Sequence, residues 1–305
     1  MRALVASGGG VELRQVPEPE TGPDRALVRV RSVSLNRGEC AALRTAEDGW
    51  RPGWDLAGEV LRAAGDGTGP PEGARVVGWV NGGSWAELAA VRTDHLAPVP
   101  DELEPEVSST LPVAGLTALG TLALGAPLPG RRVAVTGGAG GVGRFAVQLA
   151  HRDGAHVTAV VGRPERAEGL HELGADEIVV GLEPEGPAFD LILESAGGAS
   201  LAAAVSRVSA DGMIVTFGNS SNEPVTFDPR TLYRKGGPRI VGFFVTWLLE
   251  RGRIGARELG FLARLVALGQ LRSEVALRTD WSDAASAIGA LMDRLVDGKA
   301  VLSIG

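Results

Sequence analysis

A run of glycines near the middle of the chain is the first feature that points to chemistry. The segment "TGGAGGVGRFAVQLA", residues 136–150, has five glycines among its first eight residues and then becomes largely apolar. Gly138, Gly140 and Gly143 fit the pattern G-x-G-x-x-G. Residues without a Cβ allow a tight turn and a close approach of backbone to a pyrophosphate, and the third glycine lets a helix pack closely on a strand. We therefore predict a dinucleotide site here.

The flanking segments decide between this interpretation and a glycine-rich surface turn. "RRVAVTG" leads into the glycines and has the apolar character of a strand, and "GVGRFAVQLAHRDG", which includes the last of them, has the pattern of a helix. The N-terminus of that helix would present unpaired N–H groups and a positive dipole to phosphate groups. A strand, a glycine turn and a helix in this order favour the dinucleotide interpretation.

Residues after the next strand bear on which dinucleotide binds. "HVTAVVG" ends at Gly162, about 20 residues after the glycines, where sites that prefer NAD usually place an acidic residue. Gly162 leaves room, and Arg163 and Arg166 can pair with a 2′-phosphate. Each such charge-assisted hydrogen bond contributes about 1.5–3 kcal/mol, or about a ten- to hundred-fold preference. The alternative is two solvated arginines at a helix start, where the dipole disfavours cations. We predict NADPH as the cofactor.

Composition and charge argue against several other classes of function. The net charge is −7 and no basic stripe is present, which argues against nucleic-acid binding. The single cysteine, Cys40, allows neither an internal disulfide nor a cysteine-rich zinc site. We see no signal peptide, and the apolar runs fall short of the about 20 residues that a membrane helix needs. We therefore expect a cytoplasmic protein that does not associate with membranes.

The elements that must position these residues change in character near Pro112. Before it, segments such as 26–36 alternate apolar and polar residues between Gly and Pro, which predicts a β-rich barrel or sandwich. After it, helices alternate with continuous apolar strands, as in a parallel sheet buried on both faces. The predicted helices are 113–125, 141–154, 164–174, 200–209, 256–270 and 282–298, and the predicted strands are 131–137, 156–162, 177–181, 189–198, 212–218, 239–246 and 299–305. The fold class is α/β, and we expect the tail to return to the β-rich region.

Several segments in sequence order resemble those of the zinc-independent quinone oxidoreductases, the zeta-crystallin-like branch of the medium-chain dehydrogenase/reductase family. They are "SLNRGEC", "PGWDLAGEV", "LPVAGLTAL", the glycine loop, "GMIVTFGNSS" and "DGKAVLSIG". The resemblance covers nearly the whole chain. It implies a GroES-like domain at 1–113, completed by 246–305, and a doubly wound Rossmann domain at 114–245, with the cofactor between the two.

The resemblance also implies roles for individual residues. It makes Asn36, Thr117 and Trp50 the candidate catalytic residues: Asn36 would lie near the nicotinamide ribose and Thr117 at the nicotinamide ring, and Trp50 either lines the substrate pocket or only packs. The other implied cofactor-binding residues are Gly138, Ala139, Gly140, Gly141, Val142 and Gly143 at the pyrophosphate, Gly162, Arg163 and Arg166 at the adenosine phosphate, Gly218, Asn219, Ser220, Phe243, Phe244 and Val245 on the nicotinamide side, and Lys299.

The sequence departs from its zinc-containing relatives at the metal positions. Zinc alcohol dehydrogenases have a cysteine at the position of Asn36 and Gly-His-Glu where this chain has Gly53-Trp54-Asp55. The four histidines share no ligand spacing, and we expect them to be solvated. We therefore predict no metal, and we expect Asp55 to order a loop. Tyrosines that are common near the family's active site are missing, so no proton donor is identified and solvent can supply the proton.

The resemblance implies hydride transfer from NADPH to a small molecule, either a quinone or an α,β-unsaturated carbonyl. Two alternatives stay open at this point. One is a tailoring enoyl reductase dedicated to one biosynthetic intermediate, and the other is an NADPH-binding sensor or scaffold without turnover. The resemblance further implies a homodimer that forms through an edge strand such as "RIVGFFV".

Overall fold

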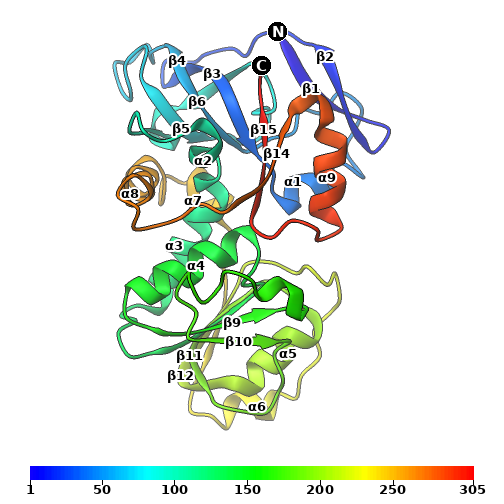
Figure 1. The fold of residues 1–305 in the computed structure, drawn as a ribbon, viewed down its shortest axis with the longest axis vertical. Coiled ribbons are helices and arrows are strands. Elements are labelled where there is room, and N and C mark those ends of the chain that lie inside the picture. Colours follow the sequence, from blue (N-terminus) through cyan, green and yellow to red (C-terminus); the bar gives the residue numbers. More distant parts are fainter. The chain divides into compact units, whose positions relative to one another are not determined.

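The computed structural model describes all residues from 1 to 305, and the chain divides into two compact units (Figure 1). The β-rich unit comprises Met1–Leu116 and Val245–Gly305, and the parallel-sheet unit comprises Thr117–Phe244. The chain therefore leaves the first unit, completes the second and returns. The predicted α/β class, with a β-rich part and a parallel-sheet part, is confirmed.

The β-rich unit is built on a seven-stranded sheet with the order β14-β15-β3-β4-β5-β7, in which β6 pairs with β3. Its strands are β3 (Arg25–Ser34), β4 (Asp55–Arg62), β5 (Arg75–Trp79), β6 (Leu88–Arg92), β7 (Leu96–Pro98), β14 (Val275–Asp280) and β15 (Lys299–Ser303). A separate hairpin consists of β1 (Arg2–Ser7) and β2 (Gly10–Gln15). The tail strand β15 runs antiparallel to β3, with Val301 opposite Ser34, so the tail returns to this region as expected.

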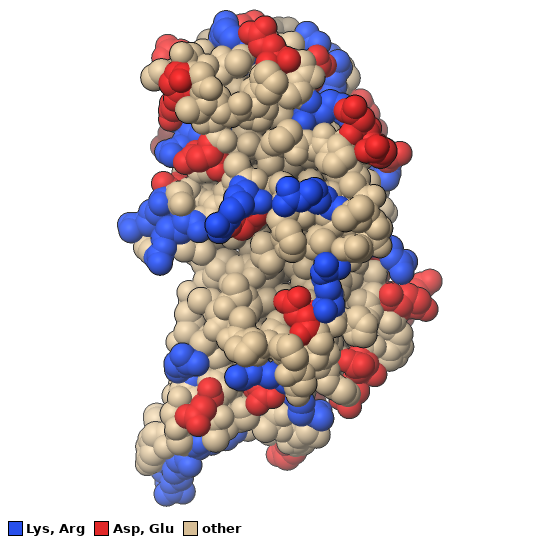
Figure 2. Space-filling model, turned by 90° about the vertical axis from the view of Figure 1, so that its left-hand side faces the viewer, with Lys and Arg blue, Asp and Glu red and all other residues tan.

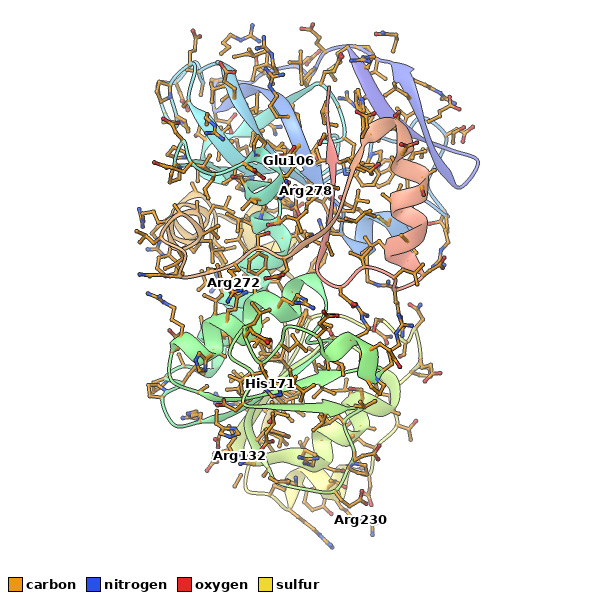
Figure 3. The ribbon with its side chains drawn as sticks, viewed as in Figure 1. Glu106, Arg132, His171, Arg230, Arg272 and Arg278 are labelled. Atoms are coloured by element: carbon orange, nitrogen blue, oxygen red, sulfur yellow. The ribbon has the colours of Figure 1, made fainter.

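Short helices cover this sheet and tie the tail to it. They are α1 (Arg37–Ala42), α2 (Pro105–Ser108), α7 (Val245–Glu250), α8 (Ala256–Ala267) and α9 (Ala284–Met292). Arg278 of β14 pairs with Glu104 at 2.8 Å, and the Ser303 hydroxyl of β15 donates to Glu106 at 3.2 Å. Figure 3 labels Arg278 and Glu106, which lie on tail and N-terminal elements of this unit. Polar contacts thus join segments that are far apart in the sequence.

The parallel-sheet unit has six parallel strands in the order β10-β9-β8-β11-β12-β13. The strands are β8 (Arg132–Thr136), β9 (His156–Val161), β10 (Glu177–Val180), β11 (Phe189–Glu194), β12 (Val208–Thr216) and β13 (Arg239–Gly242), and the helices are α3 (Leu116–Gly125), α4 (Gly141–Arg152), α5 (Gly198–Arg207) and α6 (Pro229–Tyr233). The central strands β8, β9 and β11 are almost wholly buried, as their continuous apolar runs predict. The strand order reverses between β8 and β11, and ligands of such sheets bind outside the carboxyl ends of the strands at this switch point.

Some predicted elements differ from those observed. The predicted helix 164–174 is only a short 3₁₀ turn, Pro164–Ala167, followed by irregular backbone, because Gly169 has a φ of +74° that a helix cannot contain. The predicted strand 239–246 ends at Gly242, and α7 begins at Val245. The edge strands β10 and β13 are mostly exposed rather than buried on both faces. The strands β1, β2 and β14 and the helices α1, α2, α6 and α7 were not predicted.

One helical segment is longer and more apolar than the sequence analysis expected. Pro105–Gly125 spans 21 residues with a mean hydropathy of 1.5, enough by length and composition to cross a membrane. However, 72% of its most apolar window is buried inside the protein. A buried core helix has these same properties, so the segment is weak evidence for a membrane span.

On the face drawn in Figure 2, a row of basic side chains crosses the middle, and side chains of both signs are mixed above and below it. The helix α8 exposes Arg257 and Arg264, and Arg257 pairs with the neighbouring Glu258. Basic side chains on this helix are thus partly offset by local acidic ones.

Candidate functional site

The glycine loop joins β8 to α4 and is shaped by contacts that exclude side chains. Gly137 has a φ of +65°, and the N–H of Gly140 donates to its carbonyl at 2.9 Å. A Cβ at Gly143 would lie 2.2 Å from the carbonyl oxygen of Gly137, and one at Gly138 would lie 3.1 Å from the Cβ of Ala159. The loop therefore keeps its shape only with bare backbone at Gly143, as the G-x-G-x-x-G pattern predicts.

This loop fits the phosphates of a dinucleotide. The helix α4 begins at Gly141, with Gly140 as its N-cap, and its first N–H groups have no partners within the helix. Ala139, Gly141 and Val142 complete the segment, and Ala139 is buried. The loop leaves a concave stretch of bare backbone at the N-terminus of a helix. Such a site binds anions through its N–H groups and the helix dipole.

Arg144 fixes the far side of this loop and was not singled out in the sequence. Its side chain is 7% exposed. Its guanidinium donates to the carbonyl of Ala139 at 3.2 Å and to that of Glu168 at 3.0 Å. The only signal in the sequence is a charged residue directly after the third glycine, at the start of an apolar helix face. Arg144 thus stabilises the loop from within the protein.

Gly162, Arg163 and Arg166 follow directly after β9, the neighbour of β8 in the sheet. Parallel neighbouring strands end at the same edge, so these residues and the glycine loop share one edge of the sheet. No atom lies within 4 Å of a Cβ built at Gly162, Arg163 is exposed, and Arg166 is half-buried. The space and the two guanidiniums are thus present on the surface of this unit.

The segment after β12 lies at the same edge. The N–H of Ser220 donates to the carbonyl of Ser195, which follows β11, at 3.0 Å. Gly218 and Asn219 are exposed and Ser220 is half-buried, and the side chain of Asn219 accepts from the Ser221 hydroxyl at 3.0 Å. The structure therefore joins the Gly218–Ser220 segment to the end of β11.

Thr117 and Phe243 both belong to the packing around α3. Thr117 is 5% exposed, and its carbonyl accepts from the Thr121 hydroxyl at 2.8 Å. The ring of Phe243 lies 2.4 Å from the position of a Cβ on Gly120, one turn further along α3. Phe244 is 64% exposed, and Val245 is the buried first residue of α7 in the other unit. Of Phe243, Phe244 and Val245, only Phe244 has an exposed side chain.

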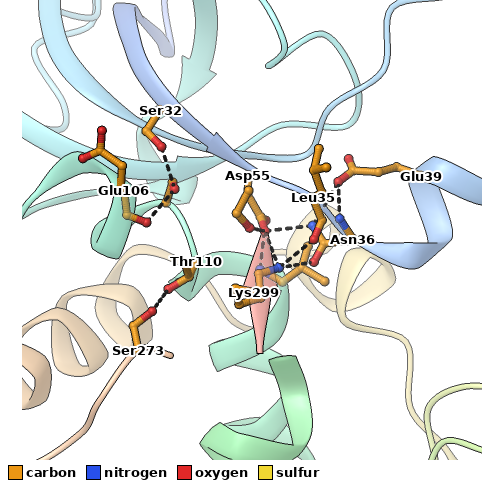
Figure 4. Close-up of polar contacts among 12 residues, drawn as sticks. Ser32, Leu35, Asn36, Glu39, Asp55, Glu106, Thr110, Ser273 and Lys299 are labelled. Carbon is orange, nitrogen blue, oxygen red and sulfur yellow. Dashed lines mark hydrogen bonds and ion pairs between the residues drawn. The ribbon is translucent and has the colours of Figure 1, made fainter. Parts of the chain in front are cut away.

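A second group of predicted residues meets in the β-rich unit. We call Ser34, Asn36, Glu39, Asp55 and Lys299 the polar cluster (Figure 4). The Lys299 ammonium donates to the Asn36 side-chain oxygen at 2.7 Å and to the carbonyl of Leu35 at 3.0 Å. The Asn36 side-chain nitrogen donates to Asp55 at 2.8 Å and to Glu39 at 3.1 Å. Because the amide oxygen faces a cation and the nitrogen faces two carboxyl groups, the orientation of this amide is fixed.

Asp55 is the central acceptor of the polar cluster. It is fully buried at the start of β4 and also accepts from the Ser34 hydroxyl at 2.8 Å and from the backbone N–H of Val113 at 3.0 Å. The Lys299 ammonium lies 3.8 Å from its carboxylate. Asp55 thus anchors the π-helical turn Leu111–Gly115 rather than the loop that the sequence analysis expected it to order.

Burial changes the proton affinities of the cluster. It raises the pKa of Glu39 to about 8, with the nearby Asp55 carboxylate as the second cause, and it raises the pKa of Asp55 against the opposing effect of Lys299. The pKa of Lys299 is lowered by burial, against the pull of Asp55 and Glu39. One Glu39 oxygen, Oε2, is buried without a hydrogen-bond partner. Glu39 is therefore a neutral acid near pH 7, whereas the charged pair is Asp55 and Lys299.

Two other sequence expectations have different outcomes. His95 is not solvated: it is 3% exposed, its Nε2 lies 2.9 Å from the carbonyl of Leu249, and burial lowers its pKa. It was mispredicted because "TDHLAPVP" has the composition of an exposed turn. Trp50 is half-buried and packs against the core of the β-rich unit, and its carbonyl accepts from the N–H of Ala6 at 2.8 Å. Part of the Trp50 side chain therefore packs, and its role in lining a substrate pocket stays a prediction.

Comparison with known proteins identifies relatives over the whole chain. Residues 22–101 match the family model described as "Alcohol dehydrogenase GroES-like domain", and residues 141–251 match "Zinc-binding dehydrogenase". The chain is 29% identical to quinone-oxidoreductase QR1, chloroplastic, of Triphysaria versicolor, over 99% of this chain and 98% of that protein. It is 32% identical to prostaglandin reductase-3 of Bos taurus, over 86% of this chain and 74% of that protein.

Solved structures give the same result. The crystal structure of the quinone oxidoreductase from Thermus thermophilus, also determined as a complex with NADPH, matches with a TM-score of 0.84. The two proteins are 31% identical, and the match covers 100% of each chain. The GroES-like and Rossmann assignments of the two parts are thereby confirmed.

The name of one family model raises the question of zinc. No group of three or more His, Cys, Asp or Glu side chains could hold a metal ion. At the positions where related enzymes have ligands, Lys299 Nζ lies 2.7 Å from Asn36 Oδ1 and 3.8 Å from Asp55 Oδ2. An ammonium in this place repels a metal cation. The residues present do not fit zinc, and no role for it follows from them.

Similarity to these relatives extends over both units of the chain. The matching proteins are named as oxidoreductases and reductases. The chain belongs to the medium-chain dehydrogenase/reductase family, with quinone oxidoreductases among its relatives, and is an oxidoreductase.

Proposed function

We propose that the chain is an NADPH-dependent, zinc-independent reductase that delivers a hydride to a quinone or to the β-carbon of an α,β-unsaturated carbonyl. The observation that carries this proposal is the glycine loop at the switch point of the parallel sheet, where Gly143 leaves no room for a Cβ. A relative that matches over its whole length was crystallised with NADPH, which supports the choice of cofactor.

The residues of the parallel-sheet unit hold and select the cofactor. The N–H groups at the start of α4 bind the pyrophosphate, and Arg144 keeps the loop in shape. Arg163 and Arg166 bind the 2′-phosphate beside the open space at Gly162. When bound, the cofactor supplies a hydride from C4 of its nicotinamide ring.

In the β-rich unit we assign Asn36 as the ligand-facing member of the polar cluster. It is half-buried, whereas Ser34, Glu39, Asp55 and Lys299 are buried. Lys299 and Asp55 hold the amide of Asn36 in one orientation. Asn36 therefore loses little side-chain entropy when it binds a ligand. A quinol or an enolate takes its proton from water, which agrees with the fact that the only tyrosine, Tyr233, belongs to the parallel-sheet unit and not to the β-rich unit.

A dedicated enoyl reductase is the second candidate for the substrate class. The similarity to prostaglandin reductase-3 favours it, because that protein is named for one class of substrate rather than for quinones. Such an enzyme would bind NADPH tightly and reduce few generic acceptors.

The experiment follows NADPH oxidation through the loss of the near-ultraviolet absorbance of the reduced nicotinamide, with a panel of quinones and enones as acceptors. Turnover of several acceptors supports the general reductase. NADPH binding with turnover of one enone only, or of none, favours the dedicated enzyme or a sensor. An absence of NADPH binding contradicts the proposal.

We also propose that β13 pairs with the β13 of a second copy. It forms one edge of the six-stranded sheet, and Ile240 on it is 39% exposed. An unpaired edge with an exposed apolar side chain favours association. Sedimentation equilibrium distinguishes the expected dimer from a monomer.

A further inference from the structure

Glu194 is a buried acid on a central strand of the parallel sheet. The proposed function gives this residue no role. It is the last residue of β11, next to β8 at the switch point, and its exposure is 0%. Its carboxyl group accepts from the Thr136 hydroxyl at 3.2 Å and from the N–H groups of Ala196 at 3.1 Å and Gly197 at 3.0 Å. It also pairs with the Ser200 hydroxyl at 2.8 Å.

All four contacts are ones that a carboxylate accepts. The two N–H groups can only donate, and the Thr136 hydroxyl already accepts from the N–H of Ser195 at 2.8 Å, so its own hydrogen points to Glu194. The Ser200 hydroxyl is free to donate as the fourth partner. No lysine, arginine or histidine pairs with Glu194. The structure thus holds a negative charge in its interior by neutral dipoles alone.

The charge lies beneath the crevice where ligands of such sheets bind. Ser195, the next residue, donates from its hydroxyl to the Thr136 carbonyl at 3.1 Å, and its carbonyl accepts from Ser220. A Cβ at Gly137 would lie 2.7 Å from the Ser195 hydroxyl oxygen. Glu194 is therefore one residue away from a contact that joins the glycine loop to the Gly218–Ser220 segment.

We propose that Glu194 is a positioning residue whose fixed negative charge makes the site favour the oxidised over the reduced form of the nicotinamide. This inference rests on the proposed function, because it requires NADPH at this edge of the sheet. The oxidised ring carries a positive charge and the reduced ring does not. A fixed charge in a low-dielectric interior stabilises the form of opposite charge, and it does so without reorganisation. Hydride donation creates that positive charge, so Glu194 assists it.

The test compares the dissociation constants of NADPH and NADP⁺ for the wild-type protein and Glu194→Gln. NADPH binding is followed by its fluorescence, and NADP⁺ binding by competition. We expect Glu194→Gln to weaken NADP⁺ binding on the order of ten-fold more than NADPH binding. A purely structural role would weaken both equally, and that result overturns the proposal.

Asp190→Asn is the matched control. It removes the same charge from the same strand, but Asp190 lies near the start of β11, where it accepts from the N–H of Arg132 at 2.9 Å and the hydroxyl of Ser209 at 3.2 Å. We expect it to leave the ratio of the two constants within about two-fold of wild type.

Glu194→Asp keeps the inference testable if the glutamine variant does not fold. It shortens the side chain but retains the charge, so both affinities can fall while their ratio stays. A ratio that shifts in Glu194→Asp as far as expected for Glu194→Gln overturns the proposal. If the wild-type protein binds neither NADPH nor NADP⁺, the proposed function fails and the inference fails with it. If it binds both but Glu194→Gln leaves the ratio of the two dissociation constants unchanged, only the inference fails.

Discussion

At the scale of single residues, burial decides which side chains of the polar cluster carry charge. Asp55 and Lys299 stabilise each other as a charged pair, although burial disfavours both charges. Glu39 lies in the same cluster without a cation in hydrogen-bond contact, and it faces Asp55 as a like charge. Its proton therefore has a direct effect on the stability of the β-rich unit.

Glu39→Gln should change how the free energy of unfolding depends on pH. The folded chain keeps the proton of Glu39 up to its pKa of about 8, whereas the unfolded chain loses it near the ordinary value of 4.5. Folding thus takes up a proton between these values, and the contribution to stability falls as pH rises through this window. Glutamine stays neutral, so we expect the stability of the variant relative to wild type to rise by about 2 kcal/mol from about pH 5.5 to 7.5.

Urea unfolding followed by tryptophan fluorescence measures this, because all six tryptophans lie in the β-rich unit. Glu59→Gln, at a half-exposed position of β4, controls for loss of a carboxylate. A relative stability of Glu39→Gln that does not change with pH contradicts the assignment of Glu39 as a neutral acid.

The polar cluster also shows a limit of sequence reasoning at this scale. The resemblance pointed to Asn36 and Lys299, but they are 263 residues apart in the chain, and only the pairing of β15 with β3 brings them together. Glu39 and Glu194 gave no signal, because an isolated acid in a sequence has the same appearance whether it becomes buried or solvated. Their roles follow from tertiary burial.

At the scale of elements, the strand, glycine turn and helix around residue 140 were predictable because their shape depends on local backbone. We expect Gly143→Ala to raise the dissociation constant of NADPH at least about ten-fold, since the new Cβ would lie 2.2 Å from the Gly137 oxygen and move the loop. Equilibrium binding by fluorescence measures this, with circular dichroism to confirm that the variant is folded.

Gly289→Ala is the comparison variant for this element. Gly289 lies inside α9 with no atom within 4 Å of a Cβ, so alanine fits and stabilises the helix by up to about 1 kcal/mol. NADPH binding as tight in Gly143→Ala as in Gly289→Ala would contradict the geometry of the loop.

Other elements were less predictable for physical reasons. The central strands are apolar on both faces and stood out, but β14 alternates between half-buried and exposed residues and has weaker apolar character. Residues 164–174 have a composition suited to a helix, yet Gly169 takes a left-handed conformation within them. The strand β14 forms by pairing with β15, and the helix α9 separates the two strands in the sequence.

At the scale of the whole molecule, the chain forms two units from three segments, and each unit carries its own part of the chemistry. The parallel-sheet unit holds the glycine loop, the two arginines and Glu194, whereas the β-rich unit holds the polar cluster. Family resemblance predicted this organisation because its motifs are distributed along nearly the whole chain. It did not identify the acceptor, since the residues that contact a substrate vary more than those that bind a shared cofactor.

The most direct test of the account is the ratio of kcat/KM for NADPH to that for NADH, measured with one acceptor for wild type and for Arg163→Ala/Arg166→Ala. We expect wild type to prefer NADPH, and the double variant to lose about ten- to hundred-fold of that preference through its KM for NADPH, with kcat little changed. Equal use of both cofactors by wild type, or an unchanged preference in the double variant, would contradict the assignment of this edge of the sheet as an NADPH site.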